Sequence, residues 1–121
     1  MRPASLDLAS LRAAWWTLRA VRRASREVSN GKLESVALPR APILPASAER
    51  GVYGILRRSE ATCLVQALVR QSWLAAQGIP RDLVVGVTPP SAGFEAHAWL
   101  DGDPECHSRE FQELLRLPCP S

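Results

Sequence analysis

Hydrophobic positions recur at helical spacing over two long stretches of the chain. The first stretch, Ser5–Val28, is rich in alanine, leucine and arginine, and the pair Asn30-Gly31 follows it as a helix stop. Steps of three and four residues place one apolar stripe on this helix, made of Leu8, Leu11, Trp15 and Leu18, with Arg22 at its end. Because two adjacent residues cannot face the same side, we predict that Trp15 enters the core and that Trp16 faces a second element or a partner.

The second helical stretch is Ser59–Gln77, which Gly78 ends. Its broad apolar face consists of Leu64, Val65, Leu68, Val69 and Ser72. Ser59 and Thr62 are both suitable N-caps for this helix. With either cap, we expect Cys63 to lie in the opening turn.

Shorter elements connect and follow these helices. Three prolines within Lys32–Ser47 exclude a regular helix, so this segment is expected to be an extended surface connector or the wall of a peptide groove. An apolar run and an alternating pattern predict the strands Leu83–Val87 and Phe94–Leu100, and Asp101-Gly102 is a strong hairpin signal. The other predictions are a short helix over Glu49–Arg57 that is interrupted or ended near Gly54, a return strand through Glu105–His107 and a short helix over Glu110–Leu117.

The composition bounds what the chain can do. With 121 residues, 46% of them hydrophobic and 22% charged, it is expected to form one globular domain of the α+β class. The net charge is only +3, but six arginines crowd the first quarter and form either a solvated helix face or a surface for an acidic partner. Aromatic residues are not interleaved with these arginines and no recognition motif is present, so we expect no nucleic-acid partner.

The cysteines and charges also indicate the cellular compartment in which the protein is expected. The three cysteines form no CxxC pair, which argues against a disulfide framework and favours a reducing environment. Arg12 and Arg19 interrupt the first apolar stretch, so we expect neither a signal peptide nor a membrane span. A phosphate-binding glycine loop is absent from the sequence, and His97, Cys106 and His107 have the wrong spacing for a usual zinc set. We therefore predict a cytoplasmic protein without metal or cofactor.

The candidate chemistry lies in one thiol and one imidazole. Cys63 is placed at a predicted helix start, where unpaired backbone N–H groups and the positive end of the helix dipole favour the thiolate. On the later predicted strand, His97 shares one face with Glu95 and Trp99. A cysteine at a helix start followed by a strand histidine is the chain order of a papain-like nucleophile and its base. Each residue alone is commonly structural, so the hypothesis depends on the pair.

Four segments carry a family resemblance, namely Ala61–Val65, Gly78-Ile79, Leu83–Val87 and Phe94–Leu100, the last containing Ala96-His97-Ala98-Trp99. Their order and spacing over roughly residues 55 to 105 resemble the transglutaminase-like leader peptidases of lasso-peptide biosynthesis. The resemblance implies a papain-like, transglutaminase-like core over residues 49–121, preceded by a helix and proline-rich connector over residues 1–48, in one compact domain. With only that helical region before the core, the chain is similar to the split form, in which a separate leader-binding protein (a RiPP recognition element) recognises the leader.

The implied function is that of a cysteine protease, which removes the leader from a ribosomally synthesised lasso-peptide precursor before macrocyclisation. Cys63 carries over as the nucleophile and His97 as the general base, which then protonates the leaving amine. We expect Trp99 to shield the imidazole from water and Glu95 to line the peptide groove. The implied partners are the precursor peptide, the leader-binding protein and, as a further candidate, the ATP-dependent macrocyclase.

The third catalytic position departs from the family pattern. The family usually has an aspartate on the strand after the hairpin, whereas residues 104–108 here are Pro-Glu-Cys-His-Ser. A three-residue hairpin loop sets His107 opposite His97 with Glu105 on the same face, whereas a two-residue loop sets Cys106 there. Either His107 or Glu105 orients His97, or the site works as a dyad. Two nearby aspartates are explained as turn residues: Asp101 and Asp103.

Two other functions fit the same sequence. A transglutaminase-like acyl transferase or amidase would use the same thiol but pass the acyl group to an amine. A non-enzymatic maturation scaffold would dock a partner through Trp16 and the arginine-rich helix, and its Cys63 would be inert to alkylation and dispensable.

Overall fold

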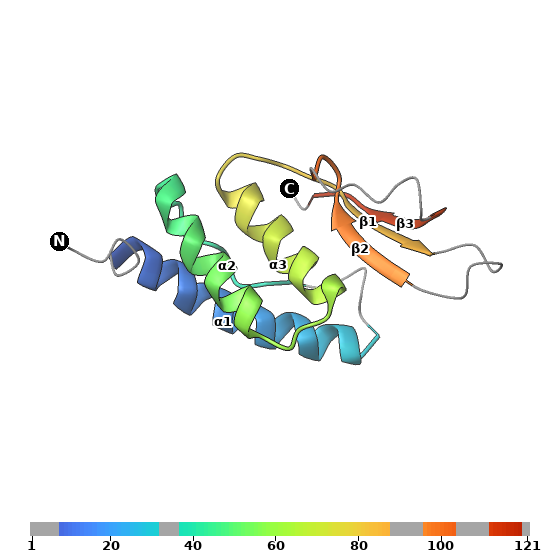
Figure 1. Ribbon diagram of the computed structural model, residues 1–121, viewed down its shortest axis with the longest axis horizontal. Coiled ribbons are helices and arrows are strands. Elements are labelled where there is room, and N and C mark those ends of the chain that lie inside the picture. Colours follow the sequence, from blue (N-terminus) through green and yellow to red (C-terminus); the bar gives the residue numbers. More distant parts are fainter. Residues whose placement is uncertain (1–7, 32–36, 88–95, 104–111, 120–121) are drawn as a thin grey trace.

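The computed structural model describes residues 8–31, 37–87, 96–103 and 112–119. The elements within these ranges are α1 (Leu8–Ser29), the 3₁₀ turn η3 (Ala46–Ala48), α2 (Glu49–Arg58), α3 (Cys63–Ala76), β1 (Leu83–Val87), β2 (Ala96–Leu100) and β3 (Gln112–Leu117). Figure 1 shows α1 and α2 on one side, the sheet on the other, and α3 between them. This is an α+β arrangement of helices and a small antiparallel sheet. Within the same ranges, no helix is long and apolar enough to cross a membrane.

The sheet has the strand order β2-β1-β3, and both neighbours run antiparallel to β1. Leu83 at the start of β1 pairs with Leu100 on one side and Leu117 on the other. The prediction of a helix over residues 110–117 is therefore wrong from Gln112 onward. Five of the six residues of this segment pair with the second edge of β1, Leu114 being left out at a register shift, and this long-range gain outweighs the local helical preference of the sequence.

The central helix α3 is buried on two faces. Val65, Val69 and Trp73 pack in the core that α3 shares with α1 and α2. On another face, Ala67 and Leu68 pack with residues of the sheet, including Leu83, Ala98 and Leu100. A helix that is apolar on more than one side is expected between two layers. The position of α3 between the helices and the sheet follows from this pattern.

The predicted buried stripe of α1 is wrong. Trp16 is only 4% exposed and Trp15 is 64% exposed, the reverse of the prediction, and Leu8 and Leu11 also face outward. The buried residues of α1 are mostly small: Ser10, Ala13, Trp16, Thr17, Ala20 and Ala24. The cause is close contact with α2, because a Cβ atom at Gly51 would overlap the Ser10 carbonyl oxygen. Small side chains permit such an approach, whereas the leucine stripe would hold the two helices apart.

Trp16 also anchors the connector, whose residues 37–45 form neither helix nor strand and whose residues 46 and 47 begin the 3₁₀ turn η3. Its indole Nε1 donates a hydrogen bond to the Pro39 carbonyl at 2.9 Å, and its ring lies 5.8 Å from that of Trp73. Gln77, the C-cap of α3, accepts a hydrogen bond from the Leu44 amide and donates one to the Pro42 carbonyl. The connector is thus held against the helical core at two points.

The two glycines of α2 provide a matched test of the close contact. We expect Gly51→Ala to lower the free energy of unfolding by about 1–3 kcal/mol, because the added methyl group forces α1 and α2 apart. Gly54→Ala, where a Cβ meets nothing within 4 Å, should instead raise it by about 0.5–1 kcal/mol through helix propensity. Urea unfolding followed by circular dichroism measures both. Equal effects of the two substitutions would contradict the close contact.

Candidate active site

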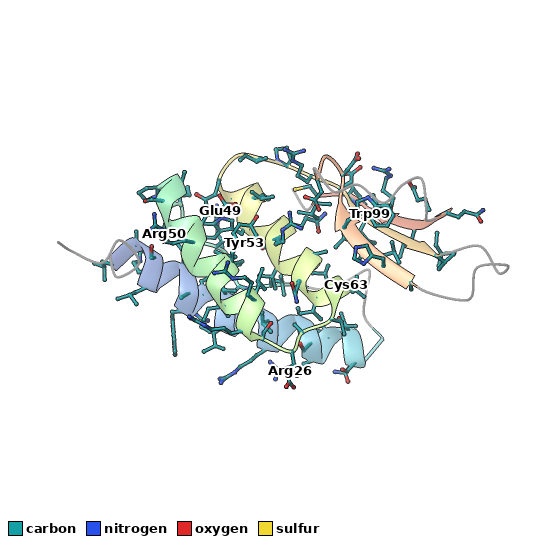
Figure 2. All side chains as sticks on the ribbon, viewed as in Figure 1. Arg26, Glu49, Arg50, Tyr53, Cys63 and Trp99 are labelled. Carbon is teal, nitrogen blue, oxygen red and sulfur yellow. The ribbon has the colours of Figure 1, made fainter. Side chains whose placement is uncertain are left out.

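Local capping fixes where α3 begins. Ser59 ends α2, and its hydroxyl donates to the Leu56 carbonyl at 2.9 Å. Thr62 then adopts an extended conformation, and its hydroxyl oxygen accepts a hydrogen bond from the Val65 amide at 3.3 Å. Of the two predicted caps, Thr62 is therefore the one used. Cys63 becomes the first residue of α3, and it is exposed (Figure 2).

The start of α3 also presents backbone donors. The Gln66 amide donates to the Thr62 carbonyl, and this is the first bond of the helical ladder. The amides of Cys63 and Leu64 precede that bond and therefore have no acceptor within the helix. They point outward at the positive end of the helix dipole. Donors in this position suit the negative oxygen that forms when a carbonyl is attacked.

His97 is the second residue of β2, where it pairs with Gly86 of β1. Its ring stacks on that of Trp99, with a centroid distance of 6.0 Å and an interplanar angle of 22°. Trp99 is buried, and its role in shielding the imidazole from water stays a prediction. Successive strand residues point to opposite faces, and Ala98 belongs to the cluster that packs on α3. His97 and Trp99 therefore lie on the other face of β2.

An ion pair between α3 and the turn after β2 fixes the position of α3 along its axis relative to β2. Arg70 donates two hydrogen bonds to the Asp103 carboxylate, at 2.7 and 3.2 Å. The carboxylate also accepts from the Leu100 amide at 3.1 Å, and the Asp103 amide closes the turn onto the Leu100 carbonyl at 3.0 Å. The turn has two central residues, and the second, Gly102, has a φ of 94°. Arg70 is thus fixed beside the end of β2.

This anchor brings Cys63 and His97 to the same end of the molecule. Figure 1 shows α3 and β2 side by side and running in the same direction, and the two elements pack together. Cys63 precedes Arg70 by seven residues of helix, which is about 10 Å at 1.5 Å per residue. His97 precedes Leu100 by three residues of strand, which is also about 10 Å. The described contacts include no hydrogen bond between the two side chains.

The electrostatics of the anchor follow from its partial burial. Burial alone would raise the pKa of Asp103, but the hydrogen bonds from Arg70 and from the Leu100 amide outweigh it and hold that pKa below its ordinary value. For Arg70, burial opposes the charge, and the bonds to Asp103 again outweigh it, so its pKa is raised. The guanidinium also lies 5.9 Å from the ring centre of Tyr53 on α2. Arg70 of α3 therefore contacts α2 through Tyr53 and the turn after β2 through Asp103.

Three predicted site residues lie outside the described residues, namely Glu95, Glu105 and His107. Their roles, the return strand and the choice of a third catalytic residue stay predictions. Among the residues that the structure describes, no group of three histidine, cysteine or acidic side chains is placed to hold a metal ion.

The role of Arg70 was not predicted from the sequence, and Asp103 was expected only as a turn residue. A signal for Arg70 was present, because it is the sole charged residue within the fourteen residues of α3. A lone arginine in a helix buried on two faces requires an anionic partner. The sequence does not identify the carboxylate, because Arg70 and Asp103 are 33 residues apart and only the fold brings them together.

The family model described as the transglutaminase-like superfamily matches residues 4–116. The chain therefore belongs to the transglutaminase-like superfamily, and the match extends beyond residues 55–105 to include α1 and all but the last residue of β3. This superfamily includes cysteine proteases and acyltransferases, and its members are typically cysteine-based enzymes. No match was found among curated proteins or among solved structures.

The Arg70–Asp103 ion pair predicts a pH-dependent difference in stability. We expect Asp103→Asn to lower the free energy of unfolding by about 2 kcal/mol at pH 7, because it removes charged hydrogen bonds from a partly buried arginine. The depressed pKa means that this stabilisation is complete above the ordinary value of about 4. It is lost as the pH falls through the lower pKa of the folded state.

Urea titrations of the wild type and of Asp103→Asn at several pH values measure this difference. Asp101→Asn is the control, since its carboxylate is exposed and pairs with Arg116 at the surface, where a loss under about 1 kcal/mol is expected. If the difference in unfolding free energy between the wild type and Asp103→Asn stays constant down to pH 2, the ion pair does not stabilise the fold through the ionised Asp103.

Proposed function

We propose that this protein is a cysteine protease that removes the leader peptide from a ribosomally synthesised lasso-peptide precursor. The observation that carries the proposal is the exposed Cys63 at the capped start of α3, at the same end of the fold as His97 on β2. Membership of a superfamily of typically cysteine-based enzymes supports the use of a thiol. The choice of substrate rests on the resemblance of the segments around Cys63 and His97 to leader peptidases.

In the proposed reaction, the Cys63 thiolate attacks the carbonyl carbon of the scissile peptide bond. The negative oxygen that forms accepts hydrogen bonds from the unpaired amides at the start of α3. His97 takes the thiol proton and gives it to the leaving amine as the C–N bond breaks. Water then hydrolyses the thioester, which releases the leader and regenerates the thiol.

The geometry places one requirement on this mechanism. His97 lies on the face of β2 that does not contact α3, so its imidazole must approach Cys63 past the outer edge of the sheet. In the strand order β2-β1-β3, β2 is an edge strand of the sheet formed by the described residues, so the approach runs past that edge. Catalytic hydrogen bonds are often long before substrate binds and tighten in the complex.

The first test is mass spectrometry of the precursor peptide from the same gene neighbourhood, incubated with this protein and the neighbouring leader-binding protein. We expect one cut at the leader–core junction. Cys63→Ala and His97→Ala should each reduce cleavage by at least about 100-fold, because they remove the nucleophile and the proton transfer. Cys119→Ala is the matched thiol control and should retain wild-type activity.

The outcomes separate the candidate functions. Cleavage that persists in Cys63→Ala would contradict the proposal. A product that carries an added primary amine in place of water would instead identify an acyl transferase. An intact precursor together with an unreactive Cys63 would leave the non-enzymatic scaffold.

Thiol reactivity gives an independent prediction. At pH 7, we expect Cys63 to be alkylated by iodoacetamide at least about 10-fold faster than Cys119, because Cys63 is exposed and lies beside the unpaired amides at the helix start, whereas Cys119 is only partly exposed. Quantitative peptide mapping over a time course compares both thiols in the same molecule. Equal alkylation rates would remove the argument for an activated nucleophile.

A further inference from the structure

A groove between α1 and α2 lies outside the candidate active site. It has a volume of about 460 Å³, and its lining includes Leu11 and Ala14 of α1 and Gly51, Gly54 and Ile55 of α2. Gly54 has no side chain to fill it and a Cβ there would meet nothing within 4 Å, whereas the α1 backbone lies directly against Gly51. The groove therefore has an apolar floor with room for a side chain of another molecule.

An exposed apolar stripe adjoins this groove. Leu11 is 53% exposed, and Leu8 and Trp15, one turn before and after it, are 73% and 64% exposed. Residues three and four positions apart are neighbours on a helix surface. Three large apolar side chains on one exposed helix face form a patch of the kind that marks an interaction site.

The charges around the groove indicate which kind of molecule would bind there. Arg50, Arg57 and Arg58 of α2 contribute to the lining, and none of the described lining residues is acidic (Figure 2 labels Arg50). An apolar floor with a cationic rim is complementary to apolar side chains flanked by carboxylates. A second copy of this chain would instead place the same arginines face to face. A membrane surface would contact a convex helix face but would not enter a groove between two helices.

We infer that the α1–α2 groove and the Leu8–Leu11–Trp15 stripe dock an acidic segment with apolar side chains on the leader-binding protein. This inference rests on the proposed function, in which a separate leader-binding protein delivers the precursor. The segment's apolar side chains enter the groove against Leu11 and Ile55, and its carboxylates pair with Arg57 and Arg58. The docked partner holds the leader near the protease and raises the effective concentration of the scissile bond.

Isothermal titration with the purified leader-binding protein, using the Cys63→Ala form of this chain, measures the docking. Leu11→Ser and Arg57→Glu should each raise the Kd by at least about 10-fold. Leu114→Ser on β3 and Arg40→Glu on the connector are matched controls, exposed residues away from the groove lining, and should change the Kd by less than about 2-fold. The affinity of the wild type should fall with added salt, and Arg57→Glu should show a weaker dependence.

Tryptophan fluorescence reports the same surface directly. The chain has four tryptophans, of which Trp16, Trp73 and Trp99 are at most 5% exposed, so acrylamide quenches mainly Trp15. A tryptophan-free version of the leader-binding protein should protect Trp15 from quenching on binding. Because Trp15 lies on the stripe, unchanged quenching in the complex would contradict coverage of this face.

The outcomes separate the inference from the proposed function. Tight binding that Leu11→Ser and Arg57→Glu leave intact, or specific cleavage without measurable binding, overturns the docking surface and leaves the protease. Loss of cleavage in the wild type with binding retained removes the protease and leaves the docking surface. Self-association in place of hetero-association, or stronger binding to phosphatidylglycerol vesicles than to the protein, assigns the groove to a different occupant and overturns the inference.

Discussion

One ion pair, between Arg70 of α3 and Asp103 after β2, is foremost among the polar contacts that set the relative position of helix and sheet, beside the hydrogen bonds from Gln71 of α3. The two hydrogen bonds of the ion pair are directional, so they fix translation along the helix axis, which apolar packing alone leaves loosely defined. Asp103 is itself held by the Leu100 amide, and Arg70 by its contact with Tyr53. The Asp103 carboxylate, held at the end of β2, thereby helps to determine how far along the sheet the start of α3 lies.

Helix α3 serves the core and the candidate chemistry with different parts of its length. Its middle and end are buried on two sides, and a buried helix cannot expose a reactive group along its side. Only its first turn emerges, where Thr62 caps it and the thiol of Cys63 is exposed. The same helix end supplies unpaired amides and a positive dipole. Burial of the rest of the helix makes this end rigid, which a preorganised site requires.

Features with local causes could be predicted from the sequence, and features with long-range causes could not. The helix start near Cys63 and the alternation around His97 depend on neighbouring residues, and the sequence predicts both, although it leaves Ser59 and Thr62 open as the cap. Segment 112–117 has local helical character, but its pairing with β1 makes it a strand. The inversion of Trp15 and Trp16 depends on Gly51, a residue of another helix whose missing side chain lets α2 approach. The small residues on one face of α1 permit that approach, but they do not identify the helix that makes it.

The exposed stripe of α1 is a consequence of how the core is built. Adjacent helix residues are separated by about 100°, so a helix that turns Trp16 inward must turn Trp15 and Leu11 outward. The small-residue face can approach Gly51 closely, and the core gains density from that approach. The cost is apolar area left in water, at about 25 cal/mol for each Å². A partner that covers this area recovers that free energy without any change in the fold, so the packing of α1 on α2 also produces an interaction surface.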